Sequence, residues 1–175
     1  MKHKLSTQGF NTDVGQWKFD ATIAEAFDHI AQREIPDYLR VIDLCLRVIA
    51  KSQYKQPKII DVGSATGETL RQLYQAGYTN IYGVESSADM LSKSFNKATL
   101  IHSDQFPEAD APFDYVINNW TLHFIQEREA YLAAIKRSLV SGGTLILTEK
   151  VSTSQCCQDL YYDMKRANGI SEIEI

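Results

Sequence analysis

The sequence predicts a single α/β domain, a doubly wound parallel sheet preceded by a helical N-terminal segment. From residue 57 onward, short apolar runs alternate with helical patterns, which is typical of parallel strands joined by crossover helices. The 175 residues, 44% of them hydrophobic, are enough to build one well-buried core. We therefore expect a helical segment over 1–56 and a ligand-binding sheet over 57–175, together forming one domain.

The N-terminal segment predicts two helices. In the first, Ile23, Phe27 and Ile30 recur at helical intervals, and Thr22 with Glu25 has the spacing of a capping box. Pro36 should end this helix, because a proline in a helix interior loses a hydrogen bond and clashes with the preceding turn. The second helix should end near the polar residues 51–56, and one face of it carries Tyr38, Val41, Ile42, Cys45 and Ile49.

Strands and helices then alternate to the end of the sequence. The helix after the second strand should begin at Ser86, which forms a capping box with Asp89. We expect the strands to follow the order 3-2-1-4-5, so that the fifth is an edge whose unpaired backbone groups favour self-association, such as a homodimer. The expected strands span 58–63, 80–85, 98–103, 113–119 and 144–150, and the other helices span 67–76, 127–140 and 154–167.

Composition argues against several classes of partner. The net charge of −4 and the dispersed charges disfavour direct binding of nucleic acid. The three cysteines, Cys45, Cys156 and Cys157, have no paired spacing that predicts a disulfide framework or a metal site. No signal-peptide pattern and no run of about 18 apolar residues is present, so we expect a soluble cytoplasmic protein with no membrane partner.

The turn DVGSATGET at 61–69 lies between the first strand and a helix, where α/β sheets bind ligands. For a dinucleotide, the glycine positions of G-x-G-x-x-G are occupied by Gly63, Ala65 and Glu68, and a carboxylate at the third would repel a pyrophosphate. NAD is therefore disfavoured. The alternative spacing Asp61-x-Gly63-x-Ala65-x-Gly67 resembles the first motif of class I S-adenosyl-L-methionine (SAM) methyltransferases, with alanine at the middle glycine. An ordinary strand-to-helix turn remains the other interpretation.

Other polar residues follow the strands in the order that this resemblance requires. Glu85 ends the second strand, where a carboxylate can accept both ribose hydroxyls, although it could also be a solvated acid. Asp104 and Gln105 follow the third strand and are candidates for the adenine amino group. After the fourth strand, Asn119 and Trp120 are expected beside the sulfonium end of the pocket.

The same stretch, NNWTLHFI, contains three further residues with side chains that could line a pocket or a core. His123 could act as a general base, but a packed histidine is the favoured interpretation. Leu122 and Phe124 are expected in the core rather than at the ligand. No catalytic residue is assigned from the sequence.

Several stretches are similar to one branch of that superfamily, the carboxy-SAM synthases. They are GQWKFDATIAEAFDHI, REIPDY, DVGSATG, NNWTLHFI, LILTEKVS and DMKRANGISEIEI. The resemblance implies a Rossmann-like methyltransferase sheet and transfer of a prephenate-derived carboxyl group to the SAM methyl carbon through a SAM ylide. The product of that reaction serves a partner enzyme in modifying the tRNA wobble uridine. The resemblance also implies that the N-terminal segment covers the cofactor site, and that the cofactor is contacted by Tyr38, Gly63, Ser64, Ala65, Glu85, Ser86, Asp104, Gln105 and Asn119.

The sequence departs from the family in places. Glu85-Ser86 stands where an Asp-Asn pair is usual, and Ser64-Ala65 where Cys-Ser is usual. The last two strands of a complete class I sheet are missing, as is an arginine that the family places beyond SEIEI to bind the extra carboxylate. Lys165-Arg166 could substitute for it or could be a solvated pair.

Three functions therefore stay open: a carboxy-SAM synthase-like transferase, a small-molecule methyltransferase, and a SAM-binding fragment without turnover. All three bind SAM, S-adenosylhomocysteine or carboxy-SAM. From the missing arginine we expect these 175 residues to bind SAM about as well as carboxy-SAM, and not to form carboxy-SAM from prephenate.

Overall fold

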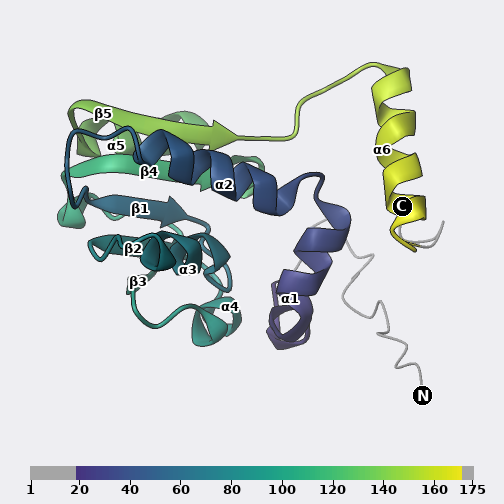
Figure 1. Cartoon of the computed structure of the whole chain (residues 1–175), viewed down its shortest axis with the longest axis horizontal. Helices are drawn as coiled ribbons and strands as arrows, with labels where there is room; N and C mark the ends of the chain where they lie inside the picture. The colour runs from purple at the N-terminus through teal and green to yellow at the C-terminus, as the bar shows by residue number, and fades with distance from the viewer. Residues whose placement is uncertain (1–18, 171–175) are drawn as a thin grey trace.

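The computed structural model describes residues 19–170 and shows a five-stranded parallel sheet between helices (Figure 1). The order β3-β2-β1-β4-β5 confirms the predicted topology, and in the described part of the chain β5 pairs with β4 alone. The strands are β1 (Ile59–Val62), β2 (Ile81–Glu85), β3 (Thr99–His102), β4 (Phe113–Asn119) and β5 (Leu139–Thr148). The helices are α1 (Ala21–Glu34), α2 (Tyr38–Ile49), α3 (Glu68–Gln75), α4 (Ala88–Lys93), α5 (Arg128–Ser138) and α6 (Gln155–Ala167), with short 3-10 turns η1 (Glu108–Asp110) and η2 (Leu122–Phe124).

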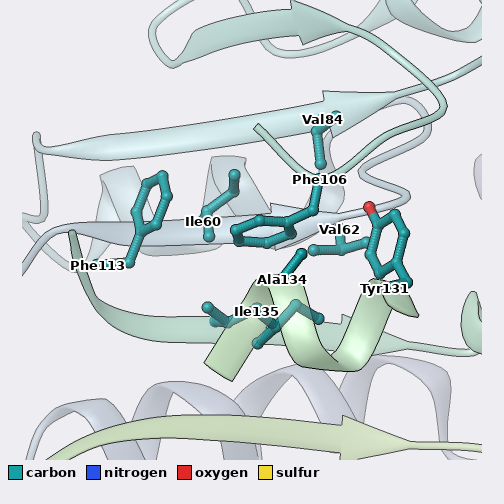
Figure 2. Close-up of a cluster of buried hydrophobic side chains, with 9 residues drawn as sticks. Ile60, Val62, Val84, Phe106, Phe113, Tyr131, Ala134 and Ile135 are labelled. Atoms are coloured by element: carbon teal, nitrogen blue, oxygen red, sulfur yellow. The ribbon is translucent and has the colours of Figure 1, made fainter. Parts of the chain in front are cut away.

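The sheet buries both of its faces. One face packs against α5 through a cluster that includes Val62, Phe113 and Ile135 (Figure 2). The other face packs against α2 and α3 through a second cluster, which includes Cys45 and Leu73. Since side chains alternate between the faces of a strand, this assignment fixes which face each strand-end residue occupies.

Helix α2 lies on the same face of the sheet as α3, whereas α1 packs against α4. Helix α2 buries Ile42, Cys45 and Ile49, three residues of the face that the sequence predicted. Helix α6 stands away from the sheet (Figure 1), and its C-terminal end contacts the end of α1, where Asn168 Nδ2 donates to the Arg33 carbonyl at 2.8 Å.

Several predicted boundaries were wrong. The α1 cap is Asp20, whose side chain accepts from Ile23 N–H, rather than Thr22. The α4 cap is Ser87, which accepts from Met90 N–H, rather than Ser86. In both cases a neighbouring polar residue offered the same capping chemistry one or two positions away.

Strand β5 begins at Leu139, five residues before the predicted start, and continues through Gly142 and Gly143. The sequence treated the two glycines as a break. The structure instead absorbs them by a register shift between Phe113 and Tyr115 of β4, so α5 passes directly into the strand.

Two stretches that carried the family resemblance fall partly outside the described residues: Gly15–Lys18 and Ser171–Ile175. Within residues 19–170, no helix is long and apolar enough to span a bilayer.

Candidate functional site

Three polar side chains end neighbouring strands on the same face of the sheet. Asp61 lies in β1, Glu85 ends β2 and Asn119 ends β4, each an even number of residues after an isoleucine of the cluster that packs on α2 and α3. The carboxyl ends of parallel strands lie at one edge of a sheet, so these side chains gather where such sheets bind ligands. The sequence placed the same three residues at this edge.

The turn after β1 requires glycines because of its backbone angles and its close neighbours within the protein. Gly63 and Gly67 have φ of +68° and +83°, and a Cβ on Gly63 would lie 2.3 Å from Thr121 Oγ1. Ala65 adopts φ of +47°, which costs a residue with a Cβ on the order of 1 kcal/mol. A side chain at Gly63 would therefore collide with the segment after β4, and one at Gly67 with Ser94 and Phe95.

Most N–H groups of this turn already have acceptors. Gly63 N–H and Ser64 N–H donate to the Val84 carbonyl at 2.9 and 3.1 Å, and Gly67 N–H donates to the Ser64 carbonyl at 2.8 Å. These three N–H groups therefore hold the turn against its own neighbours in the chain. Ser64 Oγ, by contrast, is buried and has no hydrogen-bond partner within residues 19–170.

Glu85 joins the turn to the start of α4. One carboxylate oxygen accepts from Ala65 N–H at 3.0 Å, and the other accepts from Ser87 N–H at 2.8 Å and faces Ser86 Oγ at 3.4 Å. The residue is 7% exposed. A carboxylate held on both sides in this way is fixed in direction and still has lone pairs for a ligand hydroxyl.

Asp61 is the most deeply buried acid of the site, at 4% exposure. Burial raises the pKa of its carboxyl to about 7; the charge of Glu85 adds to the rise, and a hydrogen bond with Thr69 opposes it. A cation placed beside Asp61 would favour the ionised form. The carboxyl is therefore suited to an ammonium ligand.

Two aromatic rings lie at the same edge. Tyr38 at the start of α2 stacks with Trp120 after β4, at a centroid distance of 5.3 Å and an interplanar angle of 29°. Burial, followed by the charges of Asp61 and Asp28, raises the pKa of the Tyr38 phenol, so its hydroxyl stays neutral. Trp120 has φ of +53°, a conformation that bulky residues rarely adopt and that often marks a functional site.

The end of β3 is joined to the end of β2. Ser103 N–H donates to the Glu85 carbonyl at 3.0 Å, and a His102 ring nitrogen lies 3.0 Å from the Ser86 carbonyl oxygen. Asp104 and Gln105 follow in an exposed turn, in which Gln105 N–H donates to Ser103 Oγ at 3.0 Å. The predicted adenine-end residues therefore directly follow Ser103, which contacts Glu85, and both are open to solvent.

Helix α1 is anchored to the turn after β1. Thr66 Oγ1 donates to the Asp28 carboxylate, and Arg71 lies 4.0 Å from the same carboxylate while pairing with Glu68. Ala65 packs against the α1 cluster of Ile23 and Ala24. The sequence gave no signal for these contacts, because Asp28 and Thr66 are 38 residues apart and belong to no shared motif.

The short turn η2 after β4 departs from expectation. Phe124 is 49% exposed and Leu122 is not buried, so the prediction that both lie in the core was wrong. His123 is not a packed core histidine either. Its side chain is 31% exposed, and Nδ1 lies 2.7 Å from Glu149 Oε2. Glu149, the acid directly after β5, was missed by the sequence interpretation, although it lies at a strand end much as Glu85 does.

Lys165 and Arg166 differ in their surroundings. Lys165 is 12% exposed, lies over the Tyr161 ring and faces Glu34 at 4.0 Å, so it is not a solvated lysine. Arg166 is 45% exposed and pairs with Asp163 at 2.9 Å. Both lie on α6, which stands away from the carboxyl edge of the sheet (Figure 1).

Comparison with known proteins gives consistent results. A family model described as "Methyltransferase domain" matches residues 60–147. The chain is 34% identical over 187 aligned residues to carboxy-S-adenosyl-L-methionine synthase from Helicobacter hepaticus, with 95% of this chain and 78% of the relative covered. It is 32% identical to the enzyme of the same name from Nautilia profundicola, with 91% and 75% covered.

Solved structures share the fold at lower identity. A SAM-dependent methyltransferase from Clostridium acetobutylicum aligns with a TM-score of 0.61 at 22% identity, covering 70% of this chain and 56% of that one. The DhpI-SAM-HEP complex aligns with a TM-score of 0.59 at 16% identity, covering 80% and 66%. At these identities the likeness establishes the fold.

Proposed function

The chain belongs to the carboxy-S-adenosyl-L-methionine synthase family of SAM-dependent transferases, and within that family we propose that it transfers a carboxyl group from prephenate to SAM. It is accordingly an enzyme of the methyltransferase superfamily, and SAM is its cofactor. The observation that supports the finer assignment is the similarity to carboxy-SAM synthases over nearly the whole chain, 95% for the first relative given above. A match confined to the cofactor half would support only the superfamily.

The residues at the carboxyl edge fit SAM. Asp61 provides a buried carboxyl for the ammonium group, and Asn119 Oδ1 is a buried acceptor with no hydrogen-bond partner within residues 19–170. Glu85 provides a fixed carboxylate for the ribose hydroxyls. Polar atoms buried without partners are uncommon, and a ligand that satisfies them is a direct explanation for their presence.

We assign the remaining roles along the same edge. The turn Gly63, Ser64, Ala65 and Gly67 lies against the cofactor, and Ser86 supports the ribose end. Asp104 and Gln105, in their exposed turn, bind the adenine amino group. Tyr38 and Trp120 face the sulfonium, because aromatic rings stabilise a nearby cation.

The N-terminal segment, residues 1–56, covers this site in the proposal. Its support is the link from Asp28 of α1 to Thr66 of the cofactor turn, together with Tyr38 at the start of α2. Residues 57–175 then form the cofactor-binding part of the single domain.

When bound, SAM supplies the methyl carbon that receives the carboxyl group. The described residues would hold both reactants in line and exclude water, which lowers the barrier without requiring a charged group at every atom. The product would pass to a partner enzyme that modifies tRNA, with no direct nucleic-acid contact by this chain and with the reaction in the cytoplasm. The expectation of no turnover rested only on where the sequence ends, which says nothing about the activity of the protein.

Mass spectrometry of a reaction with SAM and prephenate tests the proposal. Carboxy-SAM should appear in step with phenylpyruvate and only when both reactants are present. Methylation of an added small molecule without carboxy-SAM would establish the conventional methyltransferase instead. SAM binding by calorimetry with neither product would establish a SAM-binding protein without turnover.

A further inference from the structure

The pair formed by His123 and Glu149 lies at the ends of β4 and β5. Glu149 accepts from Leu122 N–H at 2.6 Å through one oxygen, and its other oxygen lies 2.7 Å from His123 Nδ1 and 3.3 Å from Lys150 N. Arg128 at the start of α5 donates to the Leu122 and His123 carbonyls at 3.1 and 3.0 Å. Glu149 therefore holds the imidazole, and Arg128 holds the backbone that carries it.

This arrangement selects one tautomer. A carboxylate that already receives two backbone N–H groups acts toward the ring as an acceptor, so Nδ1 carries the hydrogen that bridges to Glu149. Nε2 then presents its lone pair, and within residues 19–170 it has no hydrogen-bond partner. Such a carboxylate behind a histidine also stabilises the imidazolium that forms when Nε2 accepts a proton.

The pair is tied to the cofactor turn. Thr121, two residues before His123, donates to the Val62 carbonyl at 3.1 Å and occupies the space where Gly63 would carry a side chain. Trp120, three residues before His123, stacks on Tyr38. On the other side, Phe124 packs edge-on against Phe19 at 5.3 Å. His123 thus belongs to the segment that borders the sulfonium end of the proposed site.

We propose that His123 Nε2, with Glu149 behind Nδ1, accepts the proton that leaves the SAM methyl group. This inference rests on the proposed function. Forming a carbon–carbon bond at the methyl carbon requires one C–H bond to break. The proton goes to Nε2, and the electron pair remains on carbon to make the bond to the transferred carboxyl carbon.

The proton balance then closes without another reactant. Prephenate loses its carboxyl group and a hydroxide as its ring becomes aromatic, and the imidazolium returns its proton to that hydroxide to give water. Two charged groups from neighbouring elements lie beside His123. Glu149 after β5 contacts its ring, and Arg128 of α5 contacts backbone carbonyls only. Histidine is suited to both steps because it takes up and releases protons near neutral pH.

Hydrogen exchange tests this without prephenate. In D₂O the wild-type protein should introduce deuterium into the methyl group of SAM, and His123→Gln should slow that exchange by roughly 10²- to 10⁴-fold, the usual range for a general base. Calorimetric SAM affinity should stay within about threefold. His29→Gln removes an exposed histidine of α1 as the matched control and should exchange at the wild-type rate. Glu149→Gln keeps the imidazole but should also slow exchange.

A spectroscopic measurement is independent of turnover. Nitrogen-15 NMR of the histidine rings should show His123 protonated at Nδ1 in the neutral form, and Glu149→Gln should abolish that preference. An Nε2-protonated ring in the wild type would overturn the inference.

The reaction with prephenate separates the two proposals. Carboxy-SAM formation at the wild-type rate by His123→Gln would overturn the role of His123 and leave the function standing. Exchange that depends on His123 with no carboxy-SAM formed would support the role of His123 and contradict the proposed function. Absence of both exchange and carboxy-SAM formation in a wild-type protein that binds SAM would overturn both.

Discussion

Replacing Asp61 with asparagine should stabilise the ligand-free protein, although Asp61 belongs to the proposed site. The carboxyl is 4% exposed, and its pKa rises from 3.8 to about 7 on folding. Between pH 3.8 and about 7, the Asp61 carboxyl therefore keeps its proton in the folded state and loses it in the unfolded state. Each pKa unit corresponds to 1.36 kcal/mol, so ionised Asp61 costs about 4 kcal/mol above pH 7.

The sign of this effect sets its pH dependence. Because the folded-state pKa is raised, the cost is absent below about pH 4, grows by about 1.4 kcal/mol per pH unit, and levels off above pH 7. Asparagine is neutral throughout and can still accept from Thr69. Asp61→Asn should therefore raise the free energy of unfolding by about 4 kcal/mol at pH 8 and by only about 2 kcal/mol at pH 5.

Urea unfolding of the ligand-free protein at these two pH values measures the difference. At pH 8 the melting temperature should rise on the order of 10 °C for a chain of this size. Asp159→Asn, an exposed acid on α6, is the control and should change little at either pH. Equal stability of Asp61→Asn and wild type at pH 8, or a difference that does not vary with pH, would refute the reasoning.

Three further predictions follow from other parts of the structure. Glu85→Ala should weaken SAM binding by roughly 1.5–3 kcal/mol, since hydrogen bonds to a charged group are individually strong. Glu85→Gln is the companion variant, because its side-chain oxygen can still accept from Ala65 N–H. Unchanged calorimetric affinity in both variants would exclude Glu85 from the ribose site. Asn118→Leu should stabilise the protein by about 1–3 kcal/mol. The Asn118 amide is fully buried, and neither of its polar atoms has a hydrogen-bond partner in the described part of the chain. A lower urea midpoint than wild type would show that an unseen partner exists. Strand β5 pairs with β4 alone within residues 19–170 and exposes Leu147, so the protein should self-associate through this edge. Sedimentation should show a concentration-dependent species that Leu147→Lys weakens, and a monomer at all concentrations would contradict the expectation.

The central strands β1, β2 and β4 were predictable because each is an apolar run that is buried in the structure. The apolar runs around Ile59, Ile81 and Ile117 are buried on both faces, and that pattern is local. The residues at which the strands begin were less predictable. Gly142 and Gly143 indicated a break, and only the register of β4 against β5 shows how a strand passes through them.

The site was predictable to the extent that it follows strand ends. The sequence placed Asp61, Glu85 and Asn119 together because a parallel sheet gathers its carboxyl ends at one edge. The contact of Thr121 with Gly63 and the pairing of His123 with Glu149 join residues 58 and 26 positions apart, and no spacing rule links them.

Identification of the ligand that co-purifies with the protein tests the central claim most directly. Mass spectrometry under native conditions, followed by denaturation and analysis of the released small molecule, needs no assumption about the reaction. The account predicts SAM, S-adenosylhomocysteine or carboxy-SAM bound to the wild type, and loss of that ligand in Glu85→Ala. A dinucleotide such as NAD(H) in its place, or a wild-type protein that carries no ligand and gives no heat with millimolar SAM, would contradict it.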